Sequence, residues 1–120
     1  MSNLPILYIA GPMSNLPDLN YPAFHTAAAQ LRRAGFTVLN PAESDAPNAN
    51  PSWADWMRLA IAQVIQADGI ALLPGWRESR GAQVENELAK DLGMKRDTVR
   101  GWLTQAEHDR HMGYMTGKTS

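Results

Sequence analysis

The 120-residue sequence has no cysteine, and this absence excludes disulfides, thiolate nucleophiles, thiolate zinc sites and iron–sulfur ligation. It also has almost no excess charge, because 11 Lys and Arg residues face 12 Asp and Glu residues. A broad positive field for a nucleic-acid backbone or an anionic membrane is therefore missing. Any anion must be bound locally, and the chemistry must come from oxygen and nitrogen groups.

A long hydrophobic run is missing as well. The N-terminal apolar stretch follows no basic segment and is broken by Gly11 and Pro12, so we expect neither a signal peptide nor a membrane span. We expect a cytoplasmic protein with no membrane partner. The composition predicts one domain over residues 1–105, followed by a polar, irregular C-terminal tail over residues 106–120.

Short apolar runs alternate with helical patterns along the chain. The predicted strands are residues 6–10, 36–39 and 69–73, and the predicted helices are residues 23–34, 52–66 and 82–92. This alternation is typical of right-handed βαβ units around a parallel sheet. In such sheets ligands bind at the carboxyl ends of the strands, which here are followed by residues 11–13, 40–43 and 74–81.

The last of these loops carries the most informative pattern. Ser79 and Gly81 stand where a helix begins, so free backbone N–H groups and the helix dipole favour a phosphate there, flanked by Arg77 and Arg80. Glu85 lies one turn into that helix, where its side chain can point back toward the strand ends. Taken singly, such residues are most often caps, solvated helix positions or packing residues.

Four motifs in this order resemble a known family. They are Tyr8–Met13 (YIAGPM), Asn20–Phe24 (NYPAF), Asn40–Glu43 (NPAE) and Leu72–Trp76 (LLPGW), the last followed by Ser79, Gly81 and Glu85. Together they resemble the nucleoside 2-deoxyribosyltransferase-like proteins, which include the 2'-deoxynucleoside 5'-phosphate N-hydrolases. The resemblance spans residues 6–93. It implies an α/β, flavodoxin-like or Rossmann-like parallel sheet of four to five strands with helices on both faces.

The resemblance also implies roles for individual residues. Glu85 corresponds to the family's nucleophile at the anomeric carbon, and Tyr8 to the residue that holds it. Asp68 corresponds to an acid that shapes the sugar site, and Ser79 to a contact of the 5'-phosphate. A covalent glycosyl intermediate on a carboxylate suits an oxocarbenium-like transition state and requires neither a metal nor an organic cofactor.

The acid that protonates the departing base is not determined by the sequence, and Asp55, Asp68 and Glu43 are the candidates. We assign Tyr8, Asp55, Asp68 and Glu85 as candidate catalytic residues. The candidate substrate-binding residues are Gly11, Pro12, Met13, Asn20, Tyr21, Phe24, Gly75, Trp76, Ser79 and Gly81. Among these, the aromatic and amide side chains can contact a base, because aromatic faces stack on bases without selecting one.

We therefore expect cleavage, or transfer, of the N-glycosidic bond of a nucleoside 5'-monophosphate. Hydrolysis is favoured because a phosphate site suits a nucleotide better than exchange between free nucleosides. The base and the 2' substituent of the sugar stay open. We also expect a homodimer or a higher homo-oligomer, with the segment after Gly93 as the candidate contact.

Two alternatives remain. The first is a nucleotide-binding or sensing module without turnover. The second is a helix-turn-helix over residues 85–104, with Arg96, Thr98 and Arg100 on a recognition helix, because residues 94–103 make a poor buried strand. The near-zero charge and the preceding α/β pattern count against nucleic acid as a partner. His108 and His111 have metal-ligand spacing but no evident third ligand, so we expect no metal.

Overall fold

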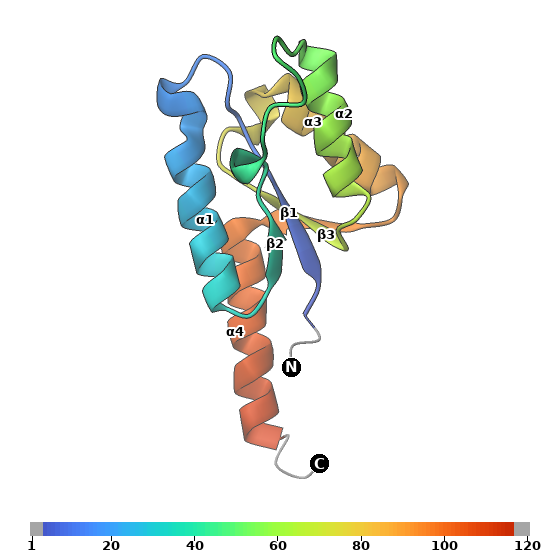
Figure 1. Ribbon diagram of the computed structural model, residues 1–120. Helices are drawn as coiled ribbons and strands as arrows, with labels where there is room; N and C mark the ends of the chain where they lie inside the picture. The colour runs from blue at the N-terminus through green and yellow to red at the C-terminus, as the bar shows by residue number, and fades with distance from the viewer. Residues whose placement is uncertain (1–3, 117–120) are drawn as a thin grey trace.

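Figure 1 shows the computed structural model, which describes residues 4–116. Four parallel strands form one sheet in the order β2-β1-β3-β4. Their bounds are Ile6–Ala10 (β1), Thr37–Leu39 (β2), Gly69–Leu72 (β3) and Lys95–Thr98 (β4). The arrangement is α/β and flavodoxin-like, which confirms the predicted fold class.

Helices cover both faces of this sheet. α1 (Tyr21–Arg33) and α4 (Val99–Thr116) lie together on one face, and α2 (Trp53–Val64) and α3 (Arg80–Asp91) lie on the other (Figure 1). Side chains alternate along a strand, so β1 sends Leu7 and Ile9 into the core under α1 and α4. It sends Tyr8 and Ala10 into the core under α2 and α3. This alternation directs Tyr8 to the face that carries α3.

A short 3-10 segment lies between each of the first three strands and the helix after it. These segments are Pro17–Asn20 (η1), Pro41–Glu43 (η2) and Trp76–Glu78 (η3). In η1 the backbone is left-handed at Asp18 and Leu19, each with φ of 53°, a conformation that costs an L residue about 1–2 kcal/mol. The loop between β1 and α1 therefore has a defined backbone conformation at the carboxyl edge of the sheet.

Residues 95–98 form a strand, which overturns the helix-turn-helix alternative. β4 pairs with β3 in parallel, and Gly93 ends α3 with a positive φ of 73°. Arg96 lies on β4, where its guanidinium donates to Asn86 Oδ1 at 3.3 Å. The strand was missed because three of its four residues are exposed at the sheet edge, and an edge strand needs no apolar run.

Residues 106–116 continue α4, where the sequence predicted an irregular tail. Val99, Trp102 and Ala106 are buried at helical spacing and anchor the helix to the core. From residue 107 to residue 111 the helix is exposed, and it continues because each added residue completes another backbone hydrogen bond. The remainder of the predicted tail, residues 117–120, lies outside the described residues.

Within residues 4–116, no helix is both long enough and apolar enough to cross a membrane.

Candidate active site

Glu85 and Tyr8 form a buried pair between α3 and β1. The Tyr8 hydroxyl donates a hydrogen bond of 2.8 Å to Glu85 Oε2. Tyr8 is 1% exposed and Glu85 is 6% exposed, so this carboxyl is among the few buried polar side chains of the described chain. β1 supplies the hydroxyl from the centre of the sheet, and α3 supplies the carboxyl from one turn past its start. The pair that the resemblance implied is therefore brought into direct contact.

Burial changes the acid–base behaviour of both groups. It raises the pKa of Glu85 to about 7, and the hydrogen bond from Tyr8 opposes this rise by stabilising the carboxylate. The pKa of Tyr8 is raised well above its ordinary value, first by burial and then by the Glu85 charge. Tyr8 therefore remains a protonated donor, while Glu85 changes its charge near neutral pH.

Glu85 and Tyr8 line a cavity of about 230 Å³ at the carboxyl edge of the sheet. Six of the predicted substrate-binding residues line the same cavity: Gly11, Met13, Tyr21, Phe24, Ser79 and Gly81. Pro41 of the second predicted loop also lines it. The structure thus joins parts of all three loops that follow β1, β2 and β3, as expected for a parallel sheet.

The start of α3 borders this cavity. Ser79 is its N-cap, and the Ser79 hydroxyl accepts a hydrogen bond of 3.2 Å from the backbone N–H of Ala82. Gly81 packs closely on α2, because a Cβ at this position would lie 3.2 Å from Met57 Sδ. The first turn of α3 therefore approaches α2 closely beside the buried carboxyl.

Four predicted substrate-binding residues do not line this cavity. The Asn20 side-chain amide donates to the Pro12 carbonyl at 3.0 Å, so these two residues brace the loop between β1 and α1. Gly75 and Trp76 line a separate hollow of about 780 Å³, which is bordered by α1 and α4. Trp76, one of the aromatic residues predicted to contact a base, therefore lies outside the cavity, and the Arg77 guanidinium lies 4.8 Å from the centre of its ring.

Two of the three candidate acids lie elsewhere. Asp68 precedes β3, so it lies at the amino edge of the sheet, where its carboxylate accepts a hydrogen bond of 2.8 Å from Ile6 N–H. Asp55 forms a capping box with Ser52 at the start of α2 and also accepts from Asn48. These hydrogen bonds, led by the one from the Ser52 backbone, lower the pKa of Asp55. Asp55 and Asp68 therefore form hydrogen bonds with the backbone and do not line the cavity.

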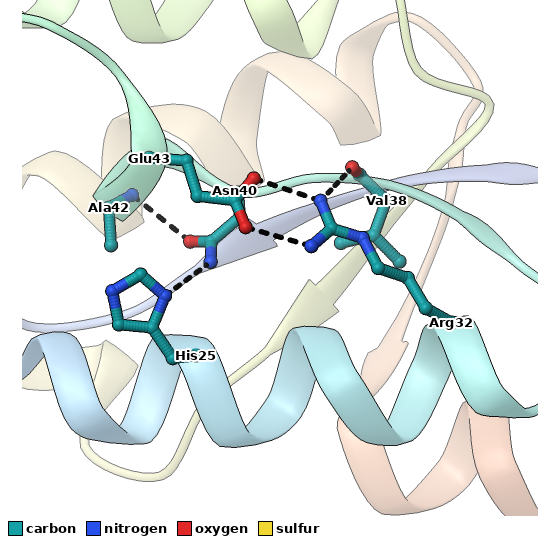
Figure 2. Close-up of polar contacts among 6 residues, drawn as sticks. All are labelled: His25, Arg32, Val38, Asn40, Ala42 and Glu43. Atoms are coloured by element: carbon teal, nitrogen blue, oxygen red, sulfur yellow. Dashed lines mark hydrogen bonds and ion pairs between the residues drawn. The ribbon is translucent and has the colours of Figure 1, made fainter.

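The third candidate, Glu43, is held by α1. Figure 2 shows Arg32 donating two hydrogen bonds to Glu43, at 2.8 and 2.9 Å, and a third to the Val38 carbonyl. The Arg32 contact lowers the pKa of Glu43, so this carboxyl is ionised and poorly suited to donate a proton. Beside it, buried Asn40 accepts from Ala42 N–H and contacts His25 (Figure 2). The network fixes η2, which carries Pro41 to the cavity.

The profile of the family described as Domain of unknown function (DUF4406) matches residues 5–96. The chain belongs to the DUF4406 family. The match contains Tyr8, Glu85 and all the other cavity-lining residues, and it ends within β4, so α4 lies beyond it. A comparison with curated proteins found no match.

Two tryptophans line the cavity of this DUF4406 domain without having been predicted as site residues. Trp53 and Trp56 lie in the first turns of α2, and they are 40% and 37% exposed. The Arg80 guanidinium lies 3.8 Å from the centre of the Trp53 ring. In the sequence, these two tryptophans lie three residues apart just after the Ser52 cap, which places them on one face of the helix. The same spacing is typical of a helix face that packs on the core, so it did not identify them as site residues.

In the part of the chain that the structure describes, no group of three or more His, Asp or Glu side chains is placed to hold a metal ion. His108 and His111 are both exposed on α4.

Proposed function

We propose that this protein hydrolyses the N-glycosidic bond of a nucleoside 5'-monophosphate, with Glu85 as the nucleophile. One observation carries the proposal: a buried carboxyl, held by the Tyr8 hydroxyl at 2.8 Å, lines an aromatic cavity at the carboxyl edge of a parallel sheet. The motifs shared with the nucleoside 2-deoxyribosyltransferase-like proteins support the same reaction class. The alternative reaction of the same class is transfer, in which the sugar passes to a second base and not to water.

In the proposed reaction, ionised Glu85 attacks the anomeric carbon and forms a glycosyl ester. The bond to the base breaks, its electron pair goes to the base nitrogen, and water in the open cavity supplies a proton to that nitrogen. A second water then attacks the anomeric carbon of the ester and gives its proton to the hydroxide left by the first water. This step releases the sugar phosphate and regenerates ionised Glu85. The Tyr8 hydroxyl keeps one carboxylate oxygen in place and leaves the other free to react.

The proposed position of the 5'-phosphate is the start of α3. Ser79 and Gly81 line the cavity there, and the exposed N–H groups of a helix start favour an anion. Arg80, the first residue of α3, adds a positive charge at the same end. This arrangement supports a phosphorylated substrate over a free nucleoside.

The direct test is a panel of ribo- and deoxyribonucleoside 5'-monophosphates, with free base measured by chromatography. We expect release of base from at least one nucleotide, and a loss of at least about a thousandfold in Glu85→Gln, because the nucleophile is removed. Glu87→Gln, on an exposed face of the same helix, is the matched control and should keep full activity. Base release that is unchanged in Glu85→Gln would refute the assignment.

A second candidate function is binding of a nucleotide without turnover. The positions of Asp55, Asp68 and Glu43 favour it, because each of these acids is engaged outside the cavity. Calorimetric binding of a nucleoside monophosphate, with no base released over a day, would support this candidate over hydrolysis.

The proposal includes a cytoplasmic homodimer or higher homo-oligomer. Light scattering on purified protein tests the oligomer, and a mass near 13.2 kDa would contradict it.

A further inference from the structure

Three of the exposed large apolar side chains of the described chain converge on the cavity that holds Glu85. Leu19 reaches it from η1, and Trp53 and Trp56 reach it from α2. Their exposed fractions are between 37% and 49%, so each presents apolar surface that the fold itself does not cover. Such surface beside a buried polar group is typical of a ligand site.

The two tryptophans are also held in place. The capping box between Ser52 and Asp55 fixes the first turn of α2, with the Asp55 N–H donating to Ser52 Oγ at 3.0 Å. The guanidinium of Arg80 stacks on the Trp53 ring at 3.8 Å from its centre. Arg80 begins the helix that carries Glu85, so the ring is fixed relative to the proposed nucleophile.

We propose that Trp53 and Trp56 bind the base of the nucleotide by stacking and that Arg80 is the positioning residue for Trp53. The inference rests on the proposed function, because the planar group in question is the departing base. When Glu85 attacks the anomeric carbon, the base projects to the other side of that carbon and needs a surface there. Aromatic rings supply one that accepts any planar base.

The test measures binding to the Glu85→Gln variant, in which turnover is removed. The ligands are the four common 2'-deoxynucleoside 5'-monophosphates and 2-deoxyribose 5-phosphate, which lacks the base. Trp53→Ala should weaken nucleotide binding by about tenfold and leave binding of the sugar phosphate unchanged. Trp53→Phe should restore most of the loss, because it keeps an aromatic face. Trp56→Ala should act in the same direction as Trp53→Ala.

Arg80 has its own expected result. Arg80→Met keeps the aliphatic stem but removes the guanidinium, and it should weaken binding of the nucleotides more than binding of the sugar phosphate. Arg80→Lys should restore part of this difference. An equal loss for both ligands would show that Arg80 binds only the phosphate and would overturn its positioning role.

Leu92→Ala is the matched control, since Leu92 is another exposed large apolar side chain, lies outside this cavity and should not affect either ligand. Three results would overturn the inference. Trp53→Ala could weaken binding of the nucleotides and of the sugar phosphate equally, it could leave nucleotide binding unchanged, or the Glu85→Gln protein could bind no nucleotide at all. A different result would refute the proposed function. If nucleotides bind through Trp53 but the wild-type protein releases no base, hydrolysis is wrong and the stacking site stands.

Discussion

The buried carboxyl of Glu85 couples the proposed site to the stability of the fold. Its ordinary pKa is 4.5 and its folded pKa is about 7, so between these values the folded protein binds more protons than the unfolded chain. The contribution of Glu85 to folding stability therefore falls as the pH rises from 4.5 to 7, and its ionised carboxylate destabilises the folded state by about 3 kcal/mol above that range. Buried acids that destabilise the folded state in this way are typical of functional sites, where the shifted pKa serves the chemistry.

Glu85→Gln should remove this cost. Relative to wild type, its free energy of unfolding should gain about 3 kcal/mol between pH 4 and pH 8, because the amide cannot ionise. Urea denaturation at the two pH values measures the gain. Glu87→Gln, on the exposed part of α3, should show no comparable gain. A constant difference between Glu85→Gln and wild type at both pH values would contradict the raised pKa.

Tyr8→Phe should raise the pKa of Glu85 further, because the hydrogen bond from Tyr8 is the contact that opposes the rise. A ¹³C NMR titration of the Glu85 carboxyl measures this directly. The variant should also lose about 2 kcal/mol of unfolding free energy at pH 8, where the acceptor is charged, and less at pH 5. Tyr21→Phe alters another tyrosine of the cavity and should leave the Glu85 titration unchanged. A titration of Glu85 that is also unchanged in Tyr8→Phe would contradict the coupling.

At the scale of elements, the sequence predicted the buried strands and the amphipathic helices, because apolar runs indicate buried strands and capping residues mark the ends of helices. It did not predict β4, whose Lys and Arg side chains are exposed at the sheet edge. Asp68, which was assigned from the family resemblance, precedes β3 and does not line the cavity. Residues that precede a parallel strand lie at the edge opposite its ligand site. Trp53 and Trp56 were missed because helical spacing alone does not separate a core face from a cavity wall.

The start of α2 has a structural role that can be tested on its own. Ser52→Ala removes the N-cap acceptor and should lower the free energy of unfolding by about 1 kcal/mol, measured by urea denaturation. Thr26→Ala, at an exposed position within α1, is the control and should be neutral or slightly stabilising, because alanine is the better helix former. If Ser52→Ala were equally harmless, the capping box would not hold the first turn that carries Trp53.

At the scale of the whole molecule, α4 lies beyond the family match but completes the core. Trp102 is 4% exposed, and its indole N–H donates to the Ile70 carbonyl on β3 at 2.7 Å. Gly69 permits this approach, since a Cβ there would lie 2.7 Å from the Trp102 ring. The helix therefore covers one face of the sheet beside α1, and only its distal part projects past the sheet (Figure 1).

Trp102→Ala tests whether α4 belongs to the cooperative fold. Removing a buried indole should cost about 3–5 kcal/mol of unfolding free energy in a urea titration. Trp102→Phe keeps most of the ring packing, including the contact with Phe36, but leaves the Ile70 carbonyl without its indole donor, so it should lose less. Thr104→Ala, exposed on the same helix, should change little. If Trp102→Ala were as stable as Thr104→Ala, α4 would be an appendage, and the sheet would have to be stable with the face under Trp102 uncovered.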